Sequence, residues 1–216
     1  INITPKGTGD VILAADSVSV GDSGAAATLR SNGAGTLTVT TGGASDLILS
    51  TNGGTNSGNI TIVDAANSDM SASPNGYGRF IINGQGAVQS LAEKITVEAT
   101  AATGTKTFDV LTQALLYYTS NASANYTLNV RGDGSTALNT IMDTGESVTI
   151  AHMVTQGGTA YYNNVFQVDG SSITPEWQGG EAPTEGNVNS IDVYTYTIIK
   201  TANATFKVLG AQTQFA

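Results

Sequence analysis

The first part of the chain alternates aliphatic and polar positions in short segments, and clusters of Gly, Asn, Ser and Asp separate these segments. Alternation with a period of two indicates β-strands, and such clusters are typical of the turns between strands. The pattern predicts short strands at residues 10–13, 17–20, 36–40, 46–49, 59–63 and 79–82.

Two turn-plus-strand frames recur in this part. Residues 5–13 and 74–82 share the frame P-x-G-x-G-x followed by three apolar residues, and residues 31–39 resemble residues 56–62. Single short strands with one narrow aliphatic face cannot bury enough surface alone. We therefore predict an elongated, repetitive β shaft over residues 1–86, a threefold β-prism or a triangular β-helix, in which neighbouring copies complete the core.

The remaining part, residues 87–216, has longer strands and a different composition. Only two of the aromatic residues, Tyr77 and Phe80, precede it. Strands are predicted at residues 94–99, 106–110, 113–118, 126–130, 147–154, 164–168, 188–199 and 205–209. Strands at this spacing indicate a jelly-roll-like β-sandwich as a C-terminal head domain. Helical periodicity is confined to residues 135–142 and 89–93, so the predicted fold class is all-β.

Charge and composition exclude several functions. The formal net charge is −9, and no cluster of Lys and Arg exists to attract a phosphate backbone, so we predict no nucleic-acid partner. No stretch approaches the roughly 20 apolar residues of a membrane span, so no membrane insertion is expected. The chain has no cysteine, which removes disulfides, thiolate chemistry and cysteine-based zinc sites.

Groups suited to catalysis are scarce. His152 is the only histidine and lies inside an alternating strand with no second histidine nearby, which favours a structural role. No glycine-rich stretch has the form of a phosphate-binding loop. We predict no catalytic residue, no metal site and no cofactor.

One loop could contact a ligand. Residues 174–183 contain Trp177, the only tryptophan, and they follow closely after Tyr161 and Tyr162. An exposed Trp beside polar groups can stack on a sugar ring, whereas a buried one anchors a core or a subunit interface. Trp177, Tyr161, Tyr162 and Glu176 are the candidate contacts for a glycan or a protein partner.

The same loop raises the question of hydrolysis. Glu176, Glu181 and Glu185 cluster there, and two carboxylates flanking a sugar could cleave a polysaccharide. Loop acids flanked by Gly and Pro are usually solvated, and no apolar pocket that would raise a pKa is evident from the sequence. The residues therefore favour binding over catalysis.

An ordered set of stretches in the second part carries a family resemblance. These stretches are Ala137–Thr140 with Gly145–Thr149, Thr159–Tyr162, Val165–Gly170, Trp177–Gly180, Val193–Tyr194 and Gln212–Ala216. Over about residues 91–216 the chain resembles the C-terminal domain of virion structural and fibre proteins of marine tailed phages, chiefly cyanophages. The repeat beginning at Pro5 is similar to the shaft repeats of such fibres.

The resemblance implies a location rather than a reaction. It places the chain on the exterior of a virion, on the tail, neck or capsid, as a homotrimer that contacts other virion proteins. The loop around Trp177 adds a host-surface glycan as a candidate ligand. The alternatives are an architectural capsid decoration or connector and, third, a fibre-borne polysaccharide depolymerase. Because Ile1 falls in a strand-like pattern, we also expect the chain to be the C-terminal part of a longer protein.

Overall fold

The computed structural model describes residues 18, 20, 27–31, 34–51, 55–63 and 65–216. The chain divides into two compact units, Ile1–Asn75 and Gly76–Ala216. The change in composition near residue 86 thus lies inside the second unit. Regular structure in the described residues is almost entirely β, which confirms the predicted fold class.

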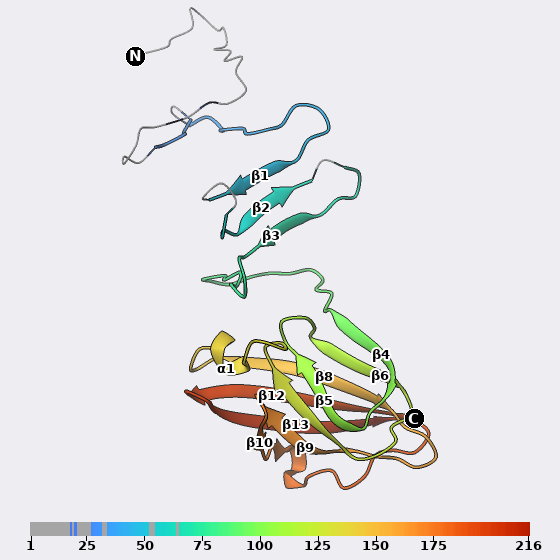
Figure 1. Cartoon of the computed structure of the whole chain (residues 1–216). Coiled ribbons are helices and arrows are strands. Elements are labelled where there is room, and N and C mark those ends of the chain that lie inside the picture. Colours follow the sequence, from blue (N-terminus) through green and yellow to red (C-terminus); the bar gives the residue numbers. More distant parts are fainter. Residues whose placement is uncertain (1–17, 19, 21–26, 32–33, 52–54, 64) are drawn as a thin grey trace, which may run out of the picture. The chain divides into compact units, whose positions relative to one another are not determined.

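The N-terminal unit contains a three-stranded antiparallel sheet, in the order β1 (Leu47–Ser50), β2 (Asn59–Ile62) and β3 (Met70–Ser73) (Figure 1). The predicted strands at 46–49 and 59–63 are confirmed. The predicted strand at 10–13 lies outside the described residues, as do residues 17 and 19 of the one at 17–20, and residues 18 and 20 are in no strand. Residues 36–40 and 79–82 form no strand, because alternation supplies a strand face but not a pairing partner.

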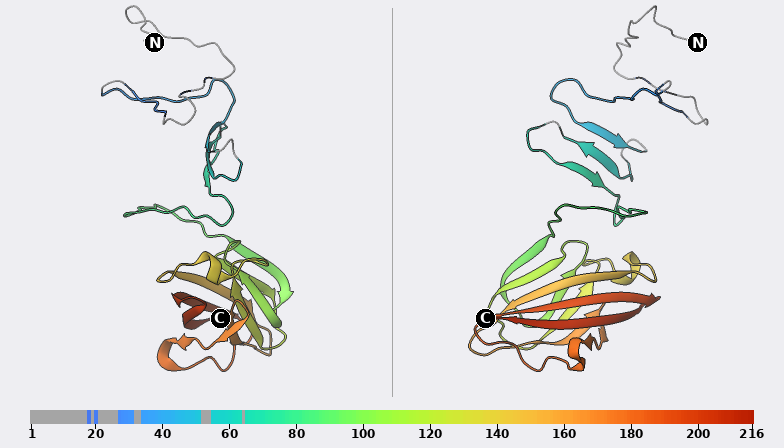
Figure 2. Two further views of the ribbon diagram at one scale, coloured as in Figure 1. Left: turned by 60° about the vertical axis from the view of Figure 1, so that its left-hand side comes forward. Right: turned by 180° about the vertical axis from the view of Figure 1, so that it is seen from behind.

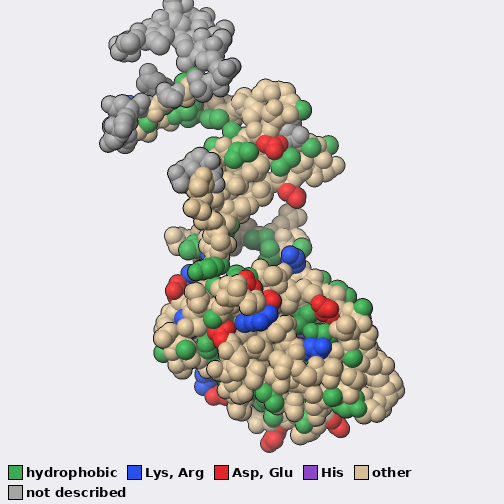
Figure 3. All heavy atoms as spheres, viewed as in Figure 1, with side chains coloured by type: hydrophobic (Ala, Val, Ile, Leu, Met, Phe, Trp, Pro, Cys, Tyr) green, Lys and Arg blue, Asp and Glu red, His purple; other side chains and the backbone are tan. Residues whose placement is uncertain are grey.

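No described residue of the N-terminal unit is a buried hydrophobic residue. Ile48 and Leu49 of β1 are 58% and 54% exposed, and Met70 of β3 is 72% exposed. Figure 3 shows hydrophobic side chains at the surface of this unit. Within one chain, the residues of this unit that the structure describes therefore form no core of their own.

The C-terminal unit contains two sheets (Figures 1 and 2). The four-stranded sheet has the order β10-β9-β7-β5, and the six-stranded sheet has the order β11-β13-β12-β8-β6-β4. The strands are β4 (Ile95–Ala101), β5 (Gly104–Asp109), β6 (Leu115–Ser120), β7 (Tyr126–Arg131), β8 (Ser147–Thr155), β9 (Asn163–Val168), β10 (Ser171–Ile173), β11 (Glu176–Trp177), β12 (Ile191–Ala202) and β13 (Thr205–Phe215).

The connections between these strands differ from those of a jelly roll. From β4 to β9 the chain passes alternately from one sheet to the other, so that β4–β6, β6–β8, β5–β7 and β7–β9 are all parallel pairs. A jelly roll is built from antiparallel Greek keys. The unit is therefore a two-layered sandwich that mixes parallel pairs with the antiparallel pairs of β12, which corrects the predicted jelly-roll connectivity. Side-chain alternation is the same in parallel and antiparallel strands and cannot distinguish them.

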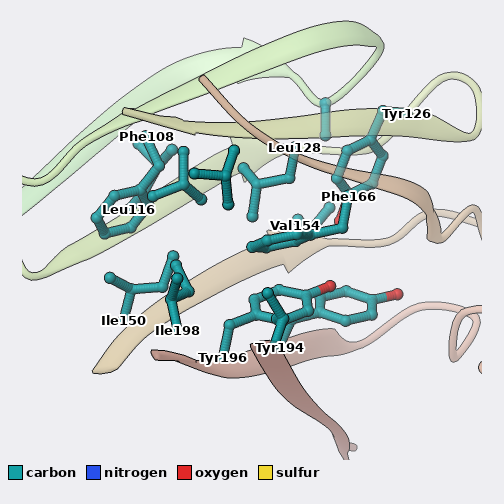
Figure 4. Packing of buried hydrophobic residues seen from close by; sticks show 14 of the residues in the cluster. Phe108, Leu116, Tyr126, Leu128, Ile150, Val154, Phe166, Tyr194, Tyr196 and Ile198 are labelled. Atoms are coloured by element: carbon teal, nitrogen blue, oxygen red, sulfur yellow. The ribbon is translucent and has the colours of Figure 1, made fainter. Parts of the chain in front are cut away.

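The core of the C-terminal unit lies between the two sheets (Figure 4). The four-stranded sheet contributes Phe108, Leu128, Val130, Phe166 and Val168. The six-stranded sheet contributes Leu116, Ile150, Val154, Tyr194, Tyr196 and Ile198. The Tyr194 and Tyr196 rings on β12 are almost parallel, with an interplanar angle of 6°. The C-terminal unit thus buries a continuous apolar core within one chain.

His152 is a core residue. It is 0% exposed and lies on β8 between Leu116 and Tyr194 in the sheet register. Its ring meets those of Tyr118 and Tyr126 edge-on, with centroids 5.6 and 5.5 Å away. Complete burial lowers its pKa to about 3, although the nearby Leu116 backbone acts in the opposite direction. His152 is therefore neutral and acts as an aromatic packing residue.

A single helical turn, α1 (Leu138–Ile141), lies within the predicted segment 135–142, whereas residues 89–93 form no helix. The Asp169 carboxylate accepts the N–H groups of Leu138 and Asn139 at 2.6 and 2.9 Å. At the other end, the buried Lys200 ammonium donates to the carbonyls of Asn139 and Met142. Residues distant in sequence thus satisfy both ends of the turn. No helix among the described residues is long and apolar enough to cross a membrane.

Candidate functional site

A pocket of about 440 Å³ lies on the side of the sandwich where β10 and β11 are the edge strands, between β9, β10 and the segment that carries Trp177. Tyr162 and Asn164 line it from the start of β9, and Thr174 and Pro175 line it from the segment after β10. Trp177 and the residues around Pro183 complete its walls. Pockets of this size are typical of small-ligand sites. Two of the four predicted contact residues, Tyr162 and Trp177, are therefore brought together.

The position of Trp177 follows from the pairing of its short strand. β11 runs parallel to β13, and Trp177 lies opposite Gly210 in the register. The indole meets the Tyr196 ring edge-on, with centroids 5.7 Å apart, and packs against the core while remaining partly exposed. The glycines that follow, Gly179 and Gly180, have φ of 81° and 85° and turn the chain away. Trp177 is both an anchor in the sandwich and a wall of the pocket.

Asn163 holds the floor of the pocket in place. Its side-chain amide donates to the backbone carbonyls of Tyr126 and Val165, both at 2.9 Å. Its side-chain oxygen accepts the Tyr196 hydroxyl at 2.6 Å. These bonds commit the buried Asn163 to the fold. The polar groups that face a ligand are instead those of the exposed residues Asn164, Ser172 and Thr174.

Tyr161 has a different role from Tyr162. Its backbone N–H donates to the Gln156 side chain at 2.9 Å, and its carbonyl accepts from the same side chain at 2.6 Å. The Gln156 amide also donates to the Asp192 carboxylate at 2.9 Å. Burial raises the pKa of Asp192, and its bonds to the Asn187 backbone and to Gln156 lower it in part. Tyr161 packs against the core and is not among the residues that line the pocket.

Glu176 lies beside a second hollow. Glu176 lines a hollow of about 390 Å³ together with Thr195 and Leu209, and Trp177 borders this hollow too. Its carboxylate pairs with the Lys207 ammonium at 2.7 Å, and both side chains are exposed. No Asp or Glu is among the described residues that line the Trp177–Tyr162 pocket. The predicted cluster of carboxylates therefore does not converge on it.

The residues that sequence analysis missed are Asn164, Ser172 and Thr174. Asn, Ser and Thr cover much of this chain, so nothing in their pattern marked these three. Aromatic rings beside exposed amide and hydroxyl groups suit a small, neutral, polar ligand with an apolar face, such as a sugar ring.

No family model, no curated protein and no solved structure matches the chain.

Proposed function

We propose that the chain is a fibre-type structural protein of a tailed-phage virion, in which associated N-terminal units form a shaft and the C-terminal sandwich attaches to the host surface. One observation carries this proposal. The C-terminal unit buries its apolar side chains in a closed core, whereas the N-terminal unit leaves its aliphatic side chains exposed. A chain of this kind suits a protein that folds its head alone and its shaft with copies of itself.

The N-terminal unit supports association. Ile60 and Ile62 on the central strand β2 are 43% and 46% exposed, although every backbone partner strand is in place. Each Å² of apolar surface removed from water contributes about 25 cal/mol, and a small sheet with both faces in water is marginal. Three such sheets around a threefold axis would bury these side chains in a homotrimer. The antiparallel β1-β2-β3 order favours a β-prism over a triangular β-helix, whose coils pair in parallel.

The pocket supports attachment. It offers the rings of Trp177 and Tyr162 with the polar groups of Asn164 and Thr174 around them. Single contacts of this type are weak, but several heads on rigid shafts act together and gain avidity. We do not propose a depolymerase, because hydrolysis needs two carboxylates across the bound sugar, and none is among the described residues lining this pocket.

The shaft is tested by mass. Light scattering of the whole chain should give three times the mass of one chain, and deletion of residues 1–86 should weaken this association. A monomer at micromolar concentration would overturn the fibre proposal.

The attachment is tested on an array of immobilised oligosaccharides. The chain should bind at least one class of sugar, and Asn164→Ala should reduce that binding roughly tenfold with little change in stability. Gln85→Ala, a change at an exposed residue that does not line the pocket, serves as the matched control. A trimer that binds no sugar would leave the architectural alternative, a capsid decoration or connector, as the better proposal.

A further inference from the structure

The six-stranded sheet has an outer face that differs from the rest of the C-terminal unit. Residues in register across β4, β6, β8, β12 and β13 form rows that point away from the core. One row consists of Ile95, Leu115, Ala151, Thr195 and Ala211. The next consists of Val97, Tyr117, Met153, Val193 and Thr213. Neither row contains a charged side chain. We call these two rows the apolar sheet face.

The apolar sheet face is open to solvent within one chain. Val97 is 58% exposed and Ile95 is 41% exposed, and Phe215 and Leu209 beside the rows are 54% and 42% exposed. Large contiguous apolar patches are rare on soluble monomers and mark interaction sites. Depletion of charge, together with Tyr and Met, is also typical of the centre of a protein interface.

The outer face of the four-stranded sheet can be compared with these rows, because it belongs to the same sandwich. On the four-stranded sheet, Asp109 and Arg131 form an ion pair at 2.7 Å that lies in the outward-pointing rows. Asn129 and Gln167 are next to each other in register there, and each makes a hydrogen bond at the surface. That face is suited to water. On the six-stranded sheet a similar ion pair, Glu176 with Lys207 at 2.7 Å, lies beyond the two rows. The rows themselves are therefore an uncharged strip within that side of the sandwich.

We propose that the apolar sheet face is where a second copy of this chain docks. The proposal rests on the proposed function, because the exposed aliphatic residues of the N-terminal unit already call for further copies. Copies joined through the N-terminal unit hold their C-terminal units at an effective concentration in the millimolar range. A weak contact is then enough to keep the C-terminal units associated.

Charge agrees with this occupant, and the area of the face means that the contact needs the help of the N-terminal unit. Chains with a net charge of −9 repel one another, so a contact between copies requires a surface without carboxylates. Five strands at a spacing of about 4.8 Å, with two rows that cover about 13 Å along each strand, give a projected face on the order of 300 Å² per copy. This is below the roughly 800 Å² per partner of a standard stable interface. The face alone is thus sufficient only with the help of the N-terminal unit.

The absence of cysteine permits a direct test in the whole chain. A nitroxide label at Thr195→Cys, an exposed position in the centre of the face on β12, should give an immobilised spectrum that is broadened by spins of neighbouring copies. Refolding labelled chains with a tenfold excess of unlabelled chains should remove the broadening. Thr107→Cys, an exposed position on β5 of the other sheet, should give a mobile and unbroadened spectrum.

A second change guards against effects of the label. Val193→Lys in the Thr195→Cys chain should free the label and remove the broadening, because an interface tolerates an unpaired buried charge poorly. Thr107→Lys is the matched control and should change neither the immobilisation of the label nor the broadening of its spectrum. A mobile label at 195 in a chain that light scattering shows to be oligomeric would overturn this proposal and leave the fibre proposal intact. If the label is immobilised but its spectrum does not sharpen when unlabelled chains are added, the occupant of the face is not a second copy. A monomeric mass would overturn both proposals.

Discussion

Gly210 lies against the indole of Trp177, and a Cβ at this position would stand 3.0 Å from two carbons of the ring. The same Cβ would lie 3.3 Å from the Tyr196 ring. The packing of the only tryptophan therefore depends on a missing side chain on the neighbouring strand. This relationship also shapes the pocket, because Trp177 is one of its walls.

Gly210→Ala should displace the indole and destabilise the C-terminal unit by about 1–3 kcal/mol, since overpacking a core forces neighbouring side chains from their positions. Thermal denaturation measures the loss. The single tryptophan also makes its own fluorescence a local reporter, and we expect its emission to move towards that of a more exposed indole. Gly158→Ala is the control, because a Cβ there meets no atom within 4 Å. Equal stability of the two variants would contradict the packing described here.

His152 should make the stability of the unit depend on pH. Its pKa is about 3 in the folded chain, whereas that of an unburied histidine ring is 6.5, so the unfolded chain binds a proton between these values and the folded chain does not. The free energy of unfolding should therefore fall as the pH falls from 6.5 towards 3, by about 1.4 kcal/mol per pH unit and roughly 5 kcal/mol in all.

His152→Phe isolates this contribution. Urea denaturation at pH 7, 6, 5 and 4 should show a shallower decline in the variant, because phenylalanine fills the aromatic cluster without binding a proton. Carboxylates that titrate in the same range are present in both chains and cancel in the comparison. Parallel stability curves for the two chains would show that the His152 ring is not buried as a neutral group.

Asp169 should contribute to stability through a turn and a helix together. Its φ of 50° and the φ of 79° at Gly170 form the tight β9–β10 connection, and its carboxylate accepts two N–H groups of α1. Asp169→Ala should cost about 1–3 kcal/mol in urea denaturation, from the lost cap and the strained backbone. Asp169→Asn retains a side-chain oxygen and tolerates positive φ, so its loss should be smaller. An alanine variant as stable as the asparagine variant would rule out both contributions.

The alternation of apolar and polar residues was sufficient to identify most strands of the C-terminal unit. Segments such as 147–154 and 205–209 became β8 and β13, because burial of one strand face requires a period of two whatever the pairing. The lone histidine was also assigned to a strand interior, and His152 proved to be fully buried. The small, exposed residues of β3 gave no such signal, since they bury no face.

The sequence by itself therefore determined the all-β class, the contrast between a glycine-rich and an aromatic-rich part, and the choice of Trp177 as a candidate contact. Only the tertiary structure decided that strands alternate between two sheets, that Trp177 is partly buried, that Tyr162 and not Tyr161 lines a pocket with it, and that Gly210 makes room for the indole. The physical reason is that side-chain periodicity follows from local backbone geometry. Pairing order, ring contacts and pockets depend on residues far apart in the chain.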